Sequence, residues 1–448
     1  MTSDSGDVPR HGSSSAGDQY LPTSGNGGYR VSRYDLELTY RMSTNLLFGR
    51  ARLLAIATES LSRFSLDLAG LRVAKVAVNG RRAQRFVTRG RKLHIWPDRP
   101  LAAGLMMTVD IQYSGNPRPL RGLWGEVGWE ELKDGVLVAS QPNGAPSWFP
   151  CNDHPSNKAS YRITVTTDSP YRVVVNGSLR ARTARGSQTT WVYDQPEPMA
   201  TYLASVQIGQ YDLVDLAKKP VPQRAAVPPR RRTRFADRFS RQPAMMAVFE
   251  KLFGSFPYSE YVVVITDDDL EIPLEAQGMS IFGANFLEDD GEQRLIAHEL
   301  AHQWFGNSLT VQSWQHIWLN EGFACYAEWL WSEQSGGPSA DRLAARHRDR
   351  LAGLPQNLVI ADPGPRLMFD DRLYKRGALT LHALRRTIGD HAFFELLRRW
   401  TTEYRYGTVT TEQFVAHSEQ YAASLRPLFT AWLYEPVLPK LPAGRPRR

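Results

Sequence analysis

Residues 296–307 read IAHELAHQWFGN. In an α-helix, residues four apart lie one above the other on the same face, so His298 and His302 can both bind one metal ion. Glu299 follows His298 directly and can hold and deprotonate a water beside that metal. This spacing predicts a hydrolytic metal centre on a helix over about residues 293–307.

A second stretch, residues 318–324 (WLNEGFA), supplies a third candidate ligand. A catalytic zinc ion usually takes three protein ligands and leaves its fourth position to water. Glu321 lies at the start of the next predicted helix, which we expect to end near Ser332. The plain structural alternative is an amphipathic helix with two half-buried histidines. The third ligand favours one Zn²⁺ per chain, held by His298, His302 and Glu321.

These two stretches together resemble the gluzincin signature of the M1 aminopeptidases, the family of aminopeptidase N and leukotriene A4 hydrolase. Residues 147–159 (SWFPCNDHPSNKA) are similar to a stretch of that family's N-terminal saddle domain, and residues 199–204 (MATYLA) resemble its last strand. The resemblance covers roughly residues 30–440 and implies that Cys151 and Asp153 are structural. The long helical C-terminal domain of many members is missing, so we expect a more open cleft, or one closed by a partner chain.

The patterns and this resemblance predict a multidomain α and β protein. An all-β N-terminal saddle domain is followed by a thermolysin-like, mixed α/β but mainly helical catalytic domain. Period-two alternation over residues 34–40 and 161–166 predicts strands, and Asn79-Gly80 and Asn176-Gly177 predict hairpin turns. The expected divisions are a disordered tail (1–28), the β-saddle domain (29–213), a Pro- and Arg-rich linker (214–241), the zinc peptidase domain (242–440) and a basic tail (441–448).

Composition is that of an ordinary soluble protein, with 42% hydrophobic and 22% charged residues. The sequence has no apolar run long enough for a bilayer and no secretory signal pattern. Two cysteines, Cys151 and Cys325, are too few for a disulfide framework. These features predict a cytoplasmic protein without a membrane partner.

The net charge of +8 raises the question of an acidic partner. The basic clusters lie at residues 230–234 and 445–448, and aromatic residues are not interleaved with them. No nucleic-acid-binding motif accompanies them. We therefore expect a solvated linker and tail and no nucleic-acid partner.

Two further residues are candidates for roles beside the metal, one in oxyanion stabilisation and one in holding a ligating histidine. Residues 373–378 (LYKRGA) resemble the family's Tyr-x-Lys-Gly stretch, although the match is inexact, and this implies that the Tyr374 hydroxyl stabilises the oxyanion. The alternative is a half-buried tyrosine at the start of a helix. Glu328 lies two turns after Glu321 on the same helix face and can hydrogen-bond a ligating histidine. A surface salt bridge is its alternative role.

An aminopeptidase also needs an anion for the substrate's α-amine. The family uses the Glu of a Gly-x-Met-Glu-Asn loop, and residues 271–280 read EIPLEAQGMS here. One register puts Glu275 in that role, and a rival register on Gly278-Met279 offers no acid. Gln141, in residues 140–143 (SQPN), corresponds to the Gln of the family's Thr-Gln-x-Glu stretch, but no acid follows it.

The sequence thus predicts a zinc aminopeptidase acting on peptides through Glu299 as general base. An endopeptidase with relaxed N-terminal recognition is the first alternative. An epoxide hydrolase is possible by family analogy only. An inactive peptide-binding scaffold would normally lack a ligand or the base, and here all are present. The oligomeric state is not indicated.

Overall fold

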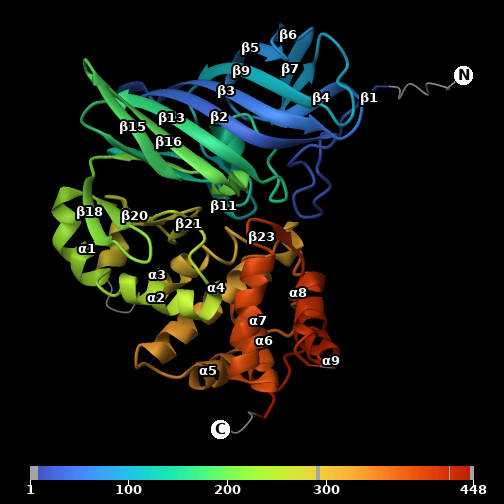
Figure 1. Cartoon of the computed structure of the whole chain (residues 1–448), viewed down its shortest axis with the longest axis vertical. Helices are drawn as coiled ribbons and strands as arrows, with labels where there is room; N and C mark the ends of the chain where they lie inside the picture. Colours follow the sequence, from blue (N-terminus) through green and yellow to red (C-terminus); the bar gives the residue numbers. More distant parts are fainter. Residues whose placement is uncertain (1–8, 289–292, 423, 444–448) are drawn as a thin grey trace, which may run out of the picture. The chain divides into compact units, whose positions relative to one another are not determined.

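The computed structural model describes residues 9–288, 293–422 and 424–443. Its contacts divide the chain into two compact units, Met1–Tyr211 and Asp212–Arg448 (Figure 1). This division lies close to the end that the sequence predicts for the β-saddle domain.

The first unit is built from strands and short turns of 3-10 helix, so the prediction of an all-β N-terminal domain is confirmed. Its strands form sheets in the orders β1-β4-β8-β7, β10-β11-β12-β17-β14 and β15-β16-β13-β2-β3-β9-β5-β6. In the long strand β2, Tyr34, Leu36, Leu38 and Tyr40 are buried, as the period of two predicts. The strands are β1 (Arg10–His11), β2 (Tyr29–Arg41), β3 (Leu46–Ala57), β4 (Leu61–Asp67), β5 (Arg72–Val78), β6 (Arg81–Arg82), β7 (Arg85–Arg89), β8 (Lys92–Trp96), β9 (Met106–Gly115), β10 (Leu120–Gly122), β11 (Gly125–Leu132), β12 (Gly135–Ala139), β13 (Ala159–Asp168), β14 (Arg172–Val175), β15 (Ser178–Arg185), β16 (Gln188–Met199) and β17 (Val206–Gly209).

One of the two predicted hairpin turns is wrong. Asn79 and Gly80 have φ of 51° and 76° and join the paired strands β5 and β6. Asn176-Gly177 instead links β14 to β15, which belong to different sheets. The Asn176 side chain donates to Leu203 O at 3.0 Å and accepts from the Ser205 amide at 2.6 Å. These tertiary hydrogen bonds hold a connection between sheets.

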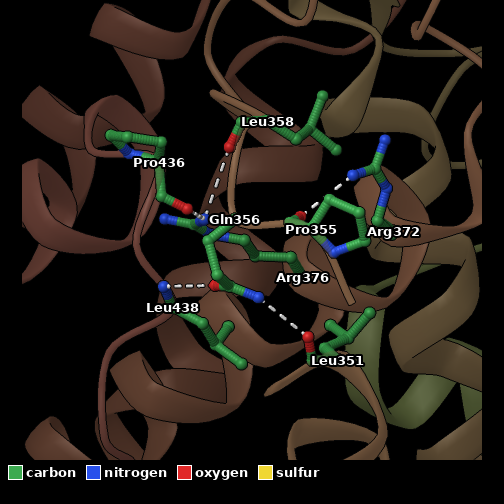
Figure 2. A pocket seen from close by; sticks show the side chains of 8 residues that line it. All are labelled: Leu351, Pro355, Gln356, Leu358, Arg372, Arg376, Pro436 and Leu438. Atoms are coloured by element: carbon green, nitrogen blue, oxygen red, sulfur yellow. Dashed lines mark hydrogen bonds between the residues drawn. The ribbon is translucent and has the colours of Figure 1, made fainter. Parts of the chain in front are cut away.

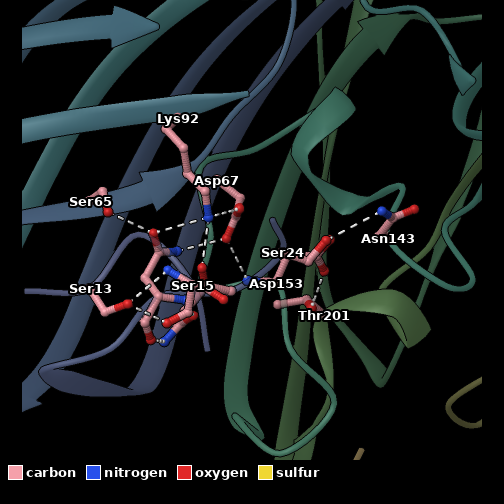
Figure 3. A network of polar contacts seen from close by, with 12 residues as sticks. Ser13, Ser15, Ser24, Ser65, Asp67, Lys92, Asn143, Asp153 and Thr201 are labelled. Atoms are coloured by element: carbon pink, nitrogen blue, oxygen red, sulfur yellow. Dashed lines mark hydrogen bonds and ion pairs between the residues drawn. The ribbon is translucent and has the colours of Figure 1, made fainter. Parts of the chain in front are cut away.

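The prediction of a disordered tail is wrong for residues 9–28, and residues 1–8 lie outside the described part of the chain. Strand β1 pairs with β4, and Tyr20 and Leu21 are buried. Asn26 donates to Asp67 Oδ2 at 2.7 Å, and its amide donates to Asn152 Oδ1 at 2.7 Å. Figure 3 shows this network around Asp67 and Lys92. Hydrogen bonds to distant residues order this segment. The sequence argument considered only its few apolar residues and so could not predict these bonds.

The predicted linker is also wrong, because most of residues 214–241 form regular structure of the second unit. Strands β18 (Asp212–Ala217) and β19 (Gln223–Val227) extend a sheet ordered β18-β19-β20-β22-β21. The other strands there are β20 (Tyr261–Ile265), β21 (Leu274–Ala276) and β22 (Met279–Phe282), and a small separate sheet pairs β23 (Thr310–Val311) with β24 (Thr408–Val409). The Arg cluster at residues 230–234 is tied down by ion pairs of Arg230 to Asp267 and Arg234 to Glu288.

Helices make up most of the regular secondary structure of the second unit, as predicted for the catalytic domain (Figure 1). Thr410 and Gln413 form a capping box at the start of α8, and Gly254, at φ 97°, ends α2. Within the described residues, no helix is both long and apolar enough to cross a membrane. The helices are α1 (Arg232–Arg238), α2 (Gln242–Phe253), α3 (Gln293–Ala301), α4 (Trp318–Gln334), α5 (Ala340–Ala352), α6 (Asp371–Ile388), α7 (Asp390–Glu403), α8 (Thr411–Ser418) and α9 (Arg426–Phe429).

Helices α4 and α6 approach closely at a pair of glycines. A Cβ added to Gly322 would lie 2.9 Å from the Cα of Gly377, so neither position has room for a side chain. Glu321 precedes Gly322, and Tyr374 lies one turn before Gly377. The close packing therefore brings these two candidate site residues toward each other.

Arg376 ties α6 to the C-terminal part of the second unit. Its guanidinium is buried and donates to the main-chain oxygens of Leu358 and Pro436 at 3.4 and 2.6 Å (Figure 2). It also donates to the main-chain oxygen of Trp432 at 3.0 Å. Burial lowers the pKa of Arg376 to about 10. Of the predicted basic tail, residues 441–443 have no regular structure and 444–448 lie outside the described residues.

Candidate metal centre and active site

The three predicted metal ligands converge. Glu321 Oε2 lies 3.4 Å from His298 Nε2 and 3.5 Å from His302 Nε2, and one ligand atom of each residue falls within 4.8 Å of the others. Helix α3 ends at Ala301, but the His302 amide still donates to His298 O at 3.2 Å, which keeps the helical spacing of the two imidazoles. All three side chains are buried.

This arrangement fits zinc. Charge-assisted hydrogen bonds are typically about 2.7–2.9 Å long, and both histidine–Glu321 contacts are longer. Donors of a tetrahedral zinc ion with bonds of about 2.0–2.2 Å lie roughly 3.3–3.6 Å apart, which matches the two contacts. Two nitrogens and one carboxylate oxygen are also a usual donor set for catalytic zinc.

The far nitrogen of each ligating imidazole is held by an acceptor. His298 Nδ1 lies 2.8 Å from Glu328 Oε1, and His302 Nδ1 lies 3.0 Å from the main-chain oxygen of Phe305. Because these partners accept, each Nδ1 carries its proton and each Nε2 is left for the metal. The predicted contact of Glu328 with His298 is thus present, and Glu328 also forms longer ion pairs with Arg294 and Lys375, at 3.8 and 3.9 Å.

The charges around the ligands favour a cation. Burial lowers the pKa of His298, but hydrogen bonds with Glu321 and Glu328 outweigh it and raise the value to about 9. Burial opposes ionisation of Glu321, yet His302 and His298 lower its pKa to about 2. The pKa of Glu328 is also lowered, because Lys375 and His298 outweigh its burial. Glu321 and Glu328 therefore stay ionised and attract positive charge, which a divalent metal would supply on displacing the histidine protons.

Glu299 lies beside the ligands with one atom unsatisfied. Its Oε2 is buried and has no hydrogen-bond partner among the described residues. Burial raises the pKa of Glu299 to about 7, although His298 and His302 oppose the shift. A carboxylate that exchanges a proton near neutral pH suits a general base.

Tyr374 lies against the metal ligands. Its ring stacks on His298 with centroids 6.1 Å apart and an angle of 14°. Burial, and then the charges of Glu321, Glu275 and Glu299, raise the pKa of Tyr374 well above its usual value. The hydroxyl therefore keeps its proton and can donate a hydrogen bond.

Glu275 lies in β21 and also reaches the site. A carboxylate oxygen of Glu275, one of Glu299 and a ring nitrogen of His302 fall within 4.8 Å of one another. Burial raises the pKa of Glu275. The sequence left two registers of this loop open. The register that uses Glu275 has its carboxylate beside the metal ligands.

Two residues that sequence reasoning missed hold this loop. Gln303 accepts from the Gly278 amide at 2.8 Å and donates to Ala276 O at 3.2 Å. Asn307 also donates to Ala276 O, at 3.0 Å. Both are fully buried amides next to the metal-binding stretch. The sequence could have indicated this role, because Gln303 and Asn307 lie beside His302, where a polar side chain is expected to be buried and to need a hydrogen-bond partner.

Gln141 lies in the first unit, in the turn after β12, and is half-buried. The peptide bond between Gln141 and Pro142 is cis. Cys151 and Asp67 exchange main-chain hydrogen bonds at 2.7 and 3.0 Å, and Asp153 accepts from Thr201 at 2.6 Å. These contacts agree with the structural roles expected for Cys151 and Asp153.

Comparison with known proteins gives a consistent result for both units. Residues 31–203 match the Peptidase M1 N-terminal domain, and residues 239–432 match the Peptidase family M1 domain. The crystal structure of an M1 zinc metallopeptidase from Deinococcus radiodurans is 32% identical, with a TM-score of 0.87, and the match covers 96% of this chain and 100% of that one.

Two further relatives carry information about ligands and activity. A mutant of the Deinococcus radiodurans protein, solved with a bound Tyr-Ser-Ala substrate, is 30% identical with a TM-score of 0.86, over 96% of this chain and 99% of that one. Leucyl aminopeptidase of Saccharolobus solfataricus is 25% identical, over 92% of this chain and 54% of that protein. The present chain spans about half the length of the curated relatives it matches.

Proposed function

Because the chain belongs to peptidase family M1, we propose that it is a zinc-dependent aminopeptidase, which removes N-terminal residues from peptides. The observation that carries the proposal is the convergence of His298, His302 and Glu321 with the carboxylates of Glu299 and Glu275 beside them. One zinc ion per chain and a cytoplasmic location remain predictions from the sequence.

The residues of the site divide the chemistry among them. His298, His302 and Glu321 would hold the zinc ion, which would act as a Lewis acid and make a water molecule nucleophilic near neutral pH. Glu299 accepts the proton of the attacking water and returns it to the leaving amine. The Tyr374 hydroxyl donates to the oxygen that gains negative charge when the carbonyl is attacked. Glu328 and Phe305 O hold the two imidazoles in orientation.

Recognition of the free amine rests on Glu275. An ammonium group beside this carboxylate would be held by a charge-assisted hydrogen bond, with the peptide bond to be cut near the metal. Gln141 is a second candidate for the same amine, by its correspondence to the family's Gln.

A matched pair of fluorogenic peptides tests the proposal, one with a free N-terminus and one N-acetylated, each with and without a chelator. We expect cleavage of the free peptide alone, and its loss on chelation. Cleavage of both peptides would instead indicate an endopeptidase and remove the role of Glu275. No cleavage of either would contradict the enzymatic proposal.

A variant sharpens the result for the amine. Glu275→Gln should lower kcat/KM on free-amine peptides by about a hundredfold, because it removes a charge-assisted hydrogen bond worth about 2–3 kcal/mol. Glu271→Gln, a change at an exposed residue in the same loop, serves as the matched control and should have no effect.

A further inference from the structure

A cavity of about 410 Å³ lies within the second unit. It adjoins the metal centre at Glu328, the carboxylate that contacts His298 Nδ1. Four of its lining side chains are cationic and two are acidic, and Trp329, Pro338 and Leu343 add apolar wall. The charged residues are Arg294, Arg346, Arg350, Lys375, Glu328 and Asp371. Two of them, Glu328 and Lys375, belong to the metal centre's surroundings, because Glu328 binds His298 and Lys375 follows Tyr374.

The acids do not neutralise the cations. Arg350 pairs with Asp371, and Lys375 Nζ is shared between Glu328 at 3.9 Å and Asp371 at 4.0 Å. Arg294 lies 3.8 Å from Glu328, which already accepts from His298. Arg346 forms no ion pair with any described residue. The cavity is therefore left with an excess of positive charge.

Two uncharged side chains at the cavity carry unsatisfied nitrogens. Trp329 and His347 stack with ring centroids 5.2 Å apart and planes 3° apart. Trp329 Nε1 and His347 Nδ1 are buried, and neither has a hydrogen-bond partner in the described part of the chain. Burial, followed by the charges of Lys375, Arg350 and Arg346, lowers the pKa of His347 to about 4. Burial is the larger cause of this shift, and the three cations add to it, so His347 stays neutral beside them.

The cavity and Glu275 lie toward opposite ends of α3. Glu275 gathers with His302 and Glu299, whereas the cavity lies at the Nδ1 side of His298 and includes Arg294, one turn earlier on the helix. Glu275 and Arg294 therefore lie toward opposite ends of the metal-binding stretch, and a peptide that runs from Glu275 across the metal would extend to the side of Arg294.

We propose that this cavity binds a carboxylate of the substrate on the leaving-group side of the scissile bond. The carboxylate belongs either to the C-terminus of a short peptide or to an acidic side chain. The assignment rests on the proposed aminopeptidase function, and it adds a substrate class to it: short or acidic peptides.

Two peptide pairs with N-terminal leucine test this assignment. The first compares Leu-Ala-Ala as the free acid with its C-terminal amide, and the second compares Leu-Glu-Ala-amide with Leu-Gln-Ala-amide. We expect kcat/KM to favour the carboxylate about tenfold in at least one pair, and the preference to shrink as salt rises. A preference in the first pair alone assigns the C-terminal carboxylate, and in the second alone the acidic side chain. Equal values in both pairs would overturn the proposal.

Variants locate the effect on the cavity. Arg346→Gln should reduce the acid-over-amide ratio severalfold, because it removes the cation that has no competing acid. Arg342→Gln, an exposed arginine one turn earlier on α5 and outside the cavity, is the matched control and should leave the ratio unchanged. An unchanged ratio in Arg346→Gln, or an equal loss in Arg342→Gln, would contradict the assignment.

Binding separates this inference from the proposed function. Zinc-loaded Glu299→Gln protein is titrated with the same four peptides, and the dissociation constants are compared. Tighter binding of the carboxylate peptides without any turnover by the parent protein would support the cavity and reject the aminopeptidase. Turnover with neither a kinetic nor a binding preference would reject the cavity and leave the aminopeptidase standing.

Discussion

Each unit contains a buried cluster of charged and polar side chains, and the two clusters differ in how they are satisfied. In the first unit, Lys92 Nζ lies 2.6 Å from Asp67 Oδ1, and Asn26 Nδ2 lies 2.7 Å from Asp67 Oδ2. In the second unit, Glu321 stands 3.4 and 3.5 Å from the two histidines, and Glu299 Oε2 has no partner among the described residues.

The difference indicates what each cluster is for. The Asp67 carboxylate is paired at ordinary hydrogen-bond lengths, so its contacts stabilise the packing of the N-terminal segment on the sheet. The contacts around Glu321 have the spacing of ligands around a shared ion. Asp153 Oδ2, beside Asp67, is also buried without a partner among the described residues. Neither burial of charge nor an unsatisfied atom is therefore a guide to function by itself, whereas contact length separates the two clusters. The predictions below test this distinction, in order of decreasing effect on turnover.

Replacing the base should have the largest effect. Glu299→Gln should lower kcat by about a thousandfold or more, because general base catalysis typically contributes about 10²–10⁴-fold. The variant should keep its zinc, measured by metal analysis, since Glu299 is not a ligand. Turnover near the parent rate with zinc bound would mean that another group takes the proton.

Removing the tyrosine hydroxyl should have the next largest effect. Tyr374→Phe keeps the ring against His298 and should lower kcat about a hundredfold with little change in KM, as for other oxyanion donors. Steady-state kinetics on one peptide measure both constants. Tyr326→Phe removes a buried hydroxyl that contacts His382 Nδ1 at 3.1 Å and should leave kcat unchanged. A rise in KM alone for Tyr374→Phe would give Tyr374 a binding role.

Loss of the carboxylate behind His298 should act through the metal. Glu328→Ala should weaken zinc affinity about 10–100-fold, since partners of this kind orient the ligand and raise its basicity. Zinc titration of activity measures the change, and saturating zinc should restore most of the rate. Glu333→Ala, on the same helix but paired with Arg385 at 2.9 Å, should leave zinc affinity unchanged. A comparable weakening in both variants would point to damage to α4 instead.

The first unit's cluster should affect stability and not the metal. Asp67→Asn leaves Lys92 buried without a counter-charge and should lower the free energy of unfolding by about 3 kcal/mol. Asp98→Asn breaks an exposed ion pair with Arg81 and should change it by less than about 1 kcal/mol. Urea denaturation measures both, and zinc content should stay at the parent level. Loss of zinc from the Asp67→Asn variant would contradict the prediction that this cluster acts on stability alone.

Sequence reasoning was most successful where function depends on a local pattern. The spacing of His298 and His302 follows from the helical repeat, and the alternation in β2 follows from the strand repeat. It was wrong for residues 9–28 and for residues 214–241. Both segments are poor in apolar pattern, and both are ordered by contacts with residues far away in the chain, such as Asp67 for Asn26 and strand β20 for strand β19.

The sequence by itself determined the two kinds of domain and the family resemblance, and it predicted the metal ligands and the base, because each is carried by residues near one another in the chain. The tertiary structure decided which register brings Glu275 to His302, how closely Gly322 and Gly377 let α4 approach α6, and where Arg294, Arg346 and Lys375 gather. The physical reason is that burial, contact length and local field all depend on neighbours in space, and most of those neighbours are remote in sequence.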